Sequence, residues 1–126
     1  MPKTSRETAS HVEDAGVMES RSEELDGYIA EFATFRADAD GTPFFKGLPG
    51  DRCQSRHWGY VVSGRLTFRY PDRDEVYEAG DAYYAPPGHV PIVTEGTEVV
   101  EFSPAEEYRQ TMEVVGRNVA AALGRV

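Results

Sequence analysis

Gly50-Asp-Arg-Cys-Gln-Ser-Arg-His-Trp-Gly-Tyr-Val-Val-Ser-Gly64 opens the stretch of sequence that decides the fold, and Pro86-Pro-Gly-His-Val-Pro91 closes it. The stretch contains Cys53, which is the only cysteine, and His57 and His89, which are two of the 3 histidines. Short alternating segments separate the two blocks, and a sheet that closes on itself brings such segments together. The pattern predicts a small β-barrel in which these three side chains share one pocket.

Alternation within the short segments predicts strands. His57 and Val61 are expected on one face of their strand, and Trp58, Tyr60 and Val62 on the other, because successive side chains in a strand point to opposite faces. About seven short strands, with a turn signal roughly every eight to twelve residues, predict an all-β sandwich or barrel. These strands are expected at 28–35, 57–62, 65–70, 75–78, 82–85, 90–94 and 97–102.

The two ends of the chain differ from this middle part. Residues 1–26 are rich in Ser, Glu, Asp and Arg and poor in apolar residues, so we expect a flexible acidic arm there. The barrel is expected over 27–103, followed over 104–124 by a helix packed on the barrel, with Ser103 as its N-cap. Apolar residues recur at helical spacing along one face of this segment, at Tyr108, Met112, Val115, Val119 and Leu123.

Length, charge and cysteine content limit the class of protein. The chain has 126 residues, enough for one domain, and a net charge of −9. This acidity argues against nucleic acid and anionic membranes as partners, since their binders carry clustered Lys and Arg. A single cysteine cannot form an intramolecular disulfide, and no apolar run reaches the roughly 20 residues of a membrane span. Residues 1–26 also lack the apolar centre of a signal peptide, so we expect a cytoplasmic protein.

The first block resembles the first sequence motif of the cupin superfamily. Gly64 stands at the glycine that ends the motif, and His57 stands at the position of its glutamate. Asp51 and Cys53 then occupy the positions of the motif's paired histidines. The resemblance extends over residues 50–91 and implies a single cupin-type antiparallel β-barrel, also called a jelly roll.

The second block matches the second cupin motif in its turn residues. Gly80, Pro86 and Gly88 stand at the motif spacing, while Pro91 stands at the histidine position and His89 lies two residues earlier. None of the four metal ligands usual in the family is therefore present in its usual identity. The resemblance indicates the fold, and the family's metal chemistry does not transfer directly to this chain.

The residues that replace the usual ligands still form a candidate metal set. Residues two apart on a strand point the same way, so Asp51 and Cys53 are expected to face inward together, as the family's histidine pair does. His89 has the same parity as Pro91. Cys53, His57 and His89, with Asp51 as an additional candidate, suit a divalent metal such as zinc or iron. The alternatives are a buried structural role for Cys53 and a surface or gating role for His89.

Phe68, Tyr83 and Tyr84 are the candidate ligand-binding residues. Tyr83 and Tyr84 flank the second block, so one of them is expected to offer its phenol to a ligand, while a packing role is the alternative for both. Parity alone does not say which tyrosine faces inward. A nucleophilic pair made by Cys53 and His57 is less favoured, because a general base is usually aimed by a third group.

These observations lead to three hypotheses about function. The first is a small-molecule binding or sensing protein, with or without a divalent metal in the barrel. The second is a metal-dependent enzyme, such as an oxygenase or isomerase of a small polar metabolite. The third is an interaction module with an empty, hydrophobic barrel. A homodimer is also expected, because the outward-facing Trp58, Tyr60 and Val62 need cover.

Overall fold

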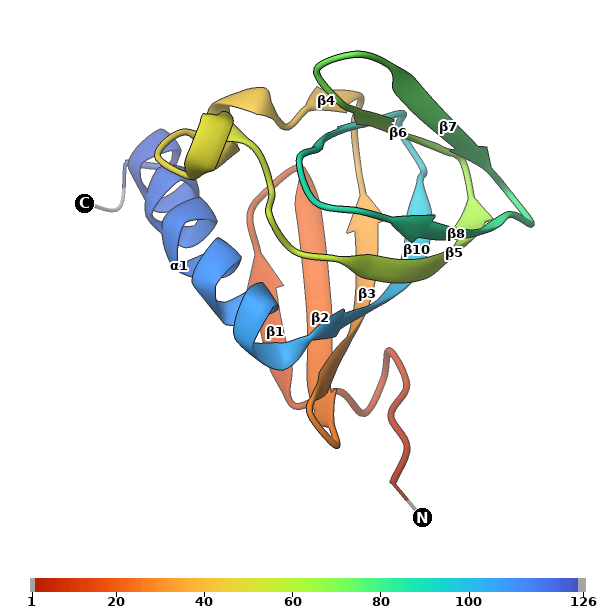
Figure 1. Ribbon diagram of the computed structural model, residues 1–126. Coiled ribbons are helices and arrows are strands. Elements are labelled where there is room, and N and C mark those ends of the chain that lie inside the picture. The colour runs from red at the N-terminus through yellow and green to blue at the C-terminus, as the bar shows by residue number, and fades with distance from the viewer. Residues whose placement is uncertain (1, 125–126) are drawn as a thin grey trace.

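Strands account for most of the regular secondary structure in a computed structural model, which describes residues 2–124 (Figure 1). Each of the seven predicted strands is present to within two residues of its expected ends. Two short 3-10 helices, η1 (Thr42–Phe45) and η2 (Pro49–Asp51), lie in the connection before β5. The strands are β1 (His11–Asp14), β2 (Met18–Leu25), β3 (Tyr28–Phe35), β4 (Ala39–Asp40), β5 (His57–Ser63), β6 (Arg65–Arg69), β7 (Asp74–Glu78), β8 (Ala82–Ala85), β9 (Val90–Val93) and β10 (Glu98–Pro104).

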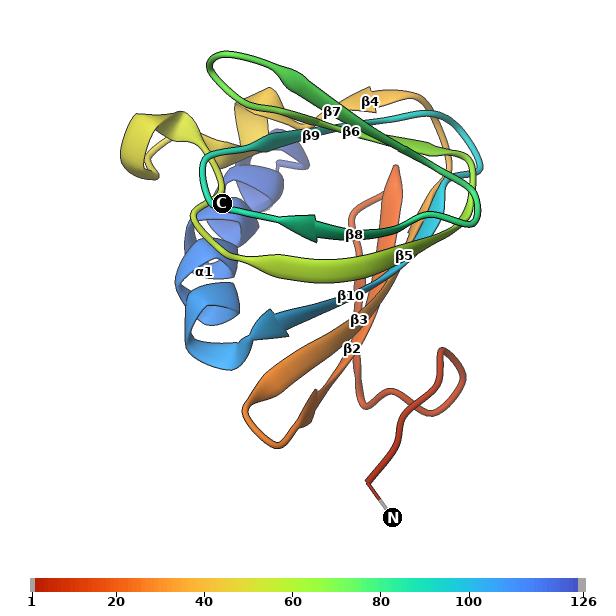
Figure 2. The ribbon, with the colours of Figure 1, turned by 45° about the vertical axis from the view of Figure 1, so that its right-hand side comes forward.

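The strands form two antiparallel sheets that lie one over the other (Figure 2). One sheet has the order β1-β2-β3-β10-β5-β8, and the other has the order β4-β9-β6-β7. Strands distant in the chain are therefore neighbours, as in a double-sheet jelly roll. The predicted all-β fold class is confirmed, and the barrel takes the form of two facing sheets.

The prediction of a flexible arm over residues 1–26 is wrong for most of its length. β1 pairs with β2, and β2 pairs with β3 along eight residue pairs, so this segment extends the larger sheet. The inward positions of β2 include Ser20 and Ser22, which are both buried. Small polar residues at inward positions concealed the apolar–polar alternation that would have indicated a strand. A segment in which nearly all residues are polar is instead predicted to be disordered.

The C-terminal helix is confirmed as α1 (Ala105–Ala122), which covers one open end of the two sheets (Figure 1). Asn118 ties it to η1 by donating from Nδ2 to the carbonyls of Phe44 at 2.8 Å and Lys46 at 2.9 Å. The N-cap prediction is wrong, since Pro104 precedes the helix without a side-chain cap and Ser103 lies within β10. No helix within residues 2–124 is long and apolar enough to cross a lipid bilayer.

The two faces of β5 separate as predicted. His57 and Val61 are buried between the sheets, whereas Trp58, Tyr60 and Val62 are exposed on the outer face. The core around Val61 is built from inward-facing residues of both sheets, namely Ala33, Leu66, Phe68, Tyr70, Tyr83, Ala85, Val93 and Val99. Alternation therefore directs His57 toward the interior, where the candidate site lies.

Candidate metal centre and cavity

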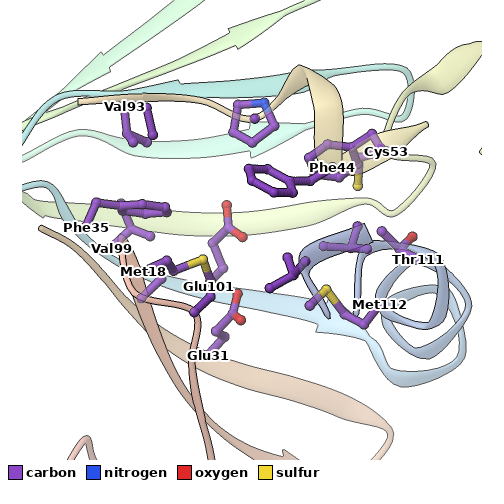
Figure 3. Close-up of a pocket in the computed structure, with 18 of the residues that line it drawn as sticks. Met18, Glu31, Phe35, Phe44, Cys53, Val93, Val99, Glu101, Thr111 and Met112 are labelled. Carbon is purple, nitrogen blue, oxygen red and sulfur yellow. The ribbon is translucent and has the colours of Figure 1, made fainter. Parts of the chain in front are cut away.

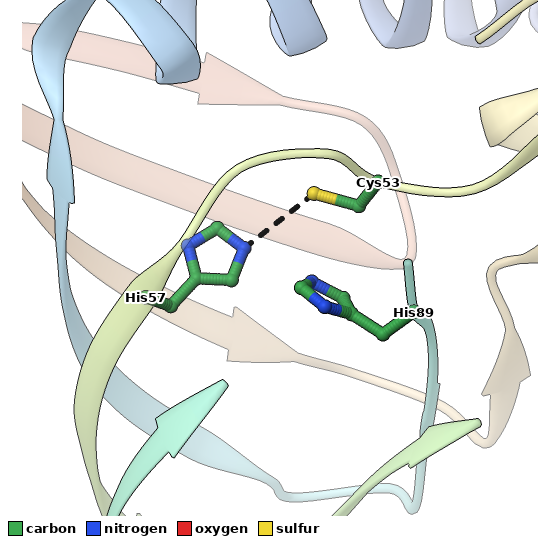
Figure 4. A group of neighbouring side chains, drawn as sticks. All are labelled: Cys53, His57 and His89. Carbon is green, nitrogen blue, oxygen red and sulfur yellow. Dashed lines mark hydrogen bonds between the residues drawn. The ribbon is translucent and has the colours of Figure 1, made fainter. Parts of the chain in front are cut away.

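Cys53, His57 and His89 converge inside the protein, as the sequence predicts (Figure 4). One potential ligand atom from each lies within 4.8 Å of the other two, and all three side chains are buried. The chain near Cys53 runs antiparallel to the chain near His89, since the Cys53 amide donates to the His89 carbonyl at 2.8 Å. His57 reaches the same point because it is the first, inward-facing residue of β5.

His89 is held so that one ring nitrogen is left without a partner. Its Nδ1 lies 2.8 Å from the carbonyl oxygen of Pro86, which only accepts hydrogen bonds, so Nδ1 carries the proton. Nε2 then has a free lone pair, and it makes no hydrogen bond although the residue is only 1% exposed. Burial, together with nearby His57, lowers the pKa of His89 to about 3. Neutral imidazole is the form that binds metals.

His57 is oriented by the hydroxyl of Ser103. Its Nδ1 lies 2.7 Å from Ser103 Oγ, and its Nε2 lies 3.5 Å from Cys53 Sγ. Burial lowers the pKa of His57 to about 4, against the opposing charge of Glu31. A metal-binding histidine commonly uses its other nitrogen in this way, because that hydrogen bond fixes the ring and the tautomer. The sequence analysis expected Ser103 to cap a helix and missed its contact with His57. The signal for that contact was a polar side chain at an inward-facing position of β10.

Cys53 is a protonated thiol in this environment. Burial is the main reason that its pKa rises from 9.0 to about 12, although a hydrogen bond with the backbone of Ser55 opposes the rise. Neither the thiol nor His57 is charged at neutral pH, which speaks against the nucleophilic pair considered above. A bound divalent cation would favour the thiolate directly. One sulfur and two neutral nitrogens fit zinc or a similar borderline metal, and the orphaned His89 Nε2 supports that fit.

Asp51 does not join this group, so its suggested role as an additional ligand is wrong. It belongs to η2, where it has a φ of 57° and an exposed side chain. Its Oδ1 accepts a hydrogen bond from the Gly47 amide at 3.0 Å. The parity argument with Cys53 required an extended chain, and the turn at residues 49–51 removes that condition.

A cavity of about 310 Å³ opens beside the three residues, between the sheets and α1 (Figure 3). Its volume is at the lower end of the roughly 300–1,000 Å³ that ligand pockets occupy. Phe68 is among the lining residues and stacks on His89 with 4.2 Å between ring centroids. Most lining side chains are apolar, including Met18, Phe35, Phe44, Leu66, Val93, Val99, Met112 and Val115.

The two candidate tyrosines have different positions. Tyr83 is buried and stacks on Tyr77 with 4.4 Å between ring centroids, and its hydroxyl donates to Glu101 Oε2 at 2.5 Å. Tyr83 therefore lies behind the cavity wall and acts on the cavity through Glu101. Tyr84 is 46% exposed and packs on Trp58 on the outer face, so it does not face the cavity.

Two carboxyl groups in the cavity wall, those of Glu31 and Glu101, were missed by the sequence analysis. They lie directly opposite each other on β3 and β10, and each residue is only 8% exposed. Burial raises the pKa of Glu101 to about 7, and burial with the neighbouring Glu101 raises the pKa of Glu31. In both strands the sequence places a glutamate at an inward-facing position among apolar residues, and this pattern could have indicated a buried carboxyl.

Solved structures of cupins share this architecture. Matches include KdgF from Halomonas sp., with 22% identity, a TM-score of 0.55, and coverage of 75% of this chain and 86% of that one. An RmlC-like cupin from Shewanella frigidimarina has 23% identity and a TM-score of 0.54, with coverage of 75% and 83%. The polyketide cyclase RemF from Streptomyces resistomycificus has 17% identity and a TM-score of 0.57, with coverage of 82% and 79%. No protein-family model and no curated protein matches the sequence.

Proposed function

Given that the chain has the cupin fold, we propose that it binds a small molecule in the cavity and one divalent metal ion at Cys53, His57 and His89. The observation that carries this proposal is the buried Nε2 of His89, which has no hydrogen-bond partner. A buried polar atom without a partner costs about 1–3 kcal/mol, so its retention suggests a role in binding. When bound, the metal would supply Lewis acidity at an open coordination position.

The wall of the cavity supports a ligand with an apolar body. Apolar side chains from both sheets and α1 surround most of the space, while the polar groups are grouped on the side of His57 and Glu101. Burial of apolar ligand surface would provide most of the binding free energy, and the grouped polar atoms would orient the ligand. An empty hydrophobic barrel is less well supported, because buried carboxyls and an orphaned imidazole serve no purpose in it.

A metal-dependent enzyme is the second candidate, and Glu101 is the observation in its favour. Its carboxyl has a pKa of about 7. Oε1 of this carboxyl lies 3.7 Å from His57 Nδ1. A buried acid that titrates near neutral pH is suited to accept or donate a proton from a ligand in the cavity. Only the enzyme would convert its ligand into a product. Incubating metal-loaded protein with metabolite mixtures, and comparing product formation by the wild-type protein with that by a Glu101→Gln variant, tests this difference.

Metal analysis tests the main proposal. Protein purified without a metal-affinity column is expected to contain about one zinc or iron per chain by elemental mass spectrometry. Titrating zinc into the metal-free protein at pH 7 should release at least about one proton per zinc, because the Cys53 thiol ionises while both imidazoles are already neutral. Zinc affinity should therefore rise about tenfold per pH unit above pH 7. Protein that contains no metal and binds no added divalent ion would contradict the proposal.

We also propose that the protein is a cytoplasmic homodimer that buries the outer face of β5 and β8. Trp58 and Tyr84 pack together on this face, and Tyr60 and Val62 extend it. The free thiol of Cys53 suits a reducing compartment. A Trp58→Glu variant is expected to shift the mass measured by light scattering from dimer to monomer, because a charge would be buried in the interface. A dimer that survives this change would place the contact elsewhere, and a wild-type monomer would exclude the dimer.

A further inference from the structure

Glu31 and Glu101 form an unusual pair, because two carboxyl groups directly opposite each other on neighbouring strands repel each other when both are ionised. Both carboxyls point into the cavity (Figure 3). The lining residues within the described part of the chain include no Lys or Arg that could balance them. The pair is therefore an acidic site inside an otherwise apolar space, and the fold alone gives no reason for it.

The hydrogen bonds around the pair leave two acceptor atoms available. Glu31 Oε2 accepts from the hydroxyls of Ser20 and Tyr108, the latter at 3.0 Å, and Glu101 Oε2 accepts from Tyr83. Among residues 2–124, no group donates a hydrogen bond to Oε1 of either glutamate, and His57 Nδ1 lies 3.7 Å from Glu101 Oε1, beyond hydrogen-bond distance. Hydroxyl donors fix each carboxyl in place, so one oxygen of each remains for an occupant of the cavity.

A second observation, which also supports the metal site, indicates that this region is built for an occupant. His89 lines the same cavity, and its buried Nε2 has no partner. The polar side of the cavity therefore presents unused acceptors, and no Lys or Arg among the lining residues of 2–124 faces them. A ligand group that carries both positive charge and several N–H donors complements two buried carboxylate oxygens better than a neutral hydroxyl does.

We propose that the small molecule bound in the cavity carries a protonated amine, which lies between Glu31 and Glu101. Its apolar body packs against Phe35, Val99 and the other apolar lining residues. This inference rests on the proposed small-molecule binding and adds the chemical class of the ligand: an amine with an apolar alkyl or aryl group.

The test compares isosteric probes on the zinc-loaded protein by isothermal titration calorimetry at pH 7. We expect 2-phenylethylamine to bind at least about 10-fold more tightly than 2-phenylethanol, because only the amine pairs with the carboxylates. Glu31→Gln should remove this preference, because it weakens binding of the amine more than binding of the alcohol. Glu113→Gln removes the same charge from an exposed position on α1 and should keep the preference. Circular dichroism melting curves confirm that each variant is folded.

Each contrary result has a distinct meaning. Equal affinity for amine and alcohol overturns the amine preference while supporting an apolar binding cavity, whereas no binding of either probe overturns both proposals. An amine preference that persists in Glu31→Gln but is lost in His89→Ala would assign the amine to the metal site and also overturn the inference. Binding of a second zinc ion that requires Glu31 would show that the pair holds a metal instead. The comparison of probes on the wild-type protein decides the question even if a variant fails to fold.

Discussion

Replacing His89 by alanine is expected to lower zinc affinity by at least about 100-fold. Changes to residues that only orient a metal ligand already cost about 10–100-fold, and this change removes a proposed ligand itself. His89 is also the residue whose Nε2 is poised for coordination, because Pro86 holds its Nδ1. Competition with a chromophoric chelator measures the affinity, and the zinc-dependent rise in melting temperature gives a second reading.

The control for this experiment is His11→Ala. His11 lies on β1 with an exposed side chain, so the same chemical change occurs far from the cavity and zinc affinity should be unchanged. Melting the metal-free forms separates loss of packing from loss of coordination, since His89 also stacks on Phe68. Zinc affinity that is unchanged in His89→Ala would exclude this residue as a ligand. Equal losses in both variants would point to a general effect of removing imidazole.

The largest effect on stability is expected at the turn between β5 and β6. Gly64 has a φ of +80°, and a Cβ atom built there would lie 2.3 Å from Thr97 Oγ1 and 2.5 Å from Thr97 Cα. Thr97 is completely buried, and its Oγ1 lies 3.0 Å from both the amide and the carbonyl of Arg65. Gly64→Ala therefore combines backbone strain with a collision that the backbone must relieve. We expect it to reduce the free energy of unfolding by about 3 kcal/mol or more.

Gly80→Ala is the matched control for this change. Gly80 has a φ of +95°, but nothing lies within 4 Å of the position that its Cβ would occupy. Only the backbone strain remains, and the expected loss is about 1–2 kcal/mol. Urea denaturation followed by circular dichroism measures both variants. If the two losses are the same, the contact with Thr97 does not contribute, because the backbone around this turn adapts to the added methyl group.

The sequence was informative where structure depends on local patterns. Period-two alternation gave β5 its inward His57 and outward Trp58, and glycine and proline placed the turns that divide the strands. Those turns also matched the cupin motifs, so the fold class followed from residues 50–91. The convergence of Cys53 and His89 could be anticipated for the same reason, since strand parity and motif position are both properties of short segments.

The sequence was less informative where contacts join distant segments. The turn at η2 removed Asp51 from the group, and Ser103 was expected to cap a helix although its hydroxyl contacts His57. Parity could not choose between Tyr83 and Tyr84, because neighbouring residues exchange faces when a strand shifts by one.

Thus the sequence by itself determined seven of the strands, the turns between them and the three residues of the candidate metal centre. Only the tertiary structure decided that β2 joins the larger sheet and that Glu31 lies opposite Glu101. For the two glutamates, the physical reason is that pairing register between strands about 70 residues apart is set by the packing of the whole core and leaves no signal in either strand alone. For β2, the polar inward residues Ser20 and Ser22 concealed the alternation of a strand.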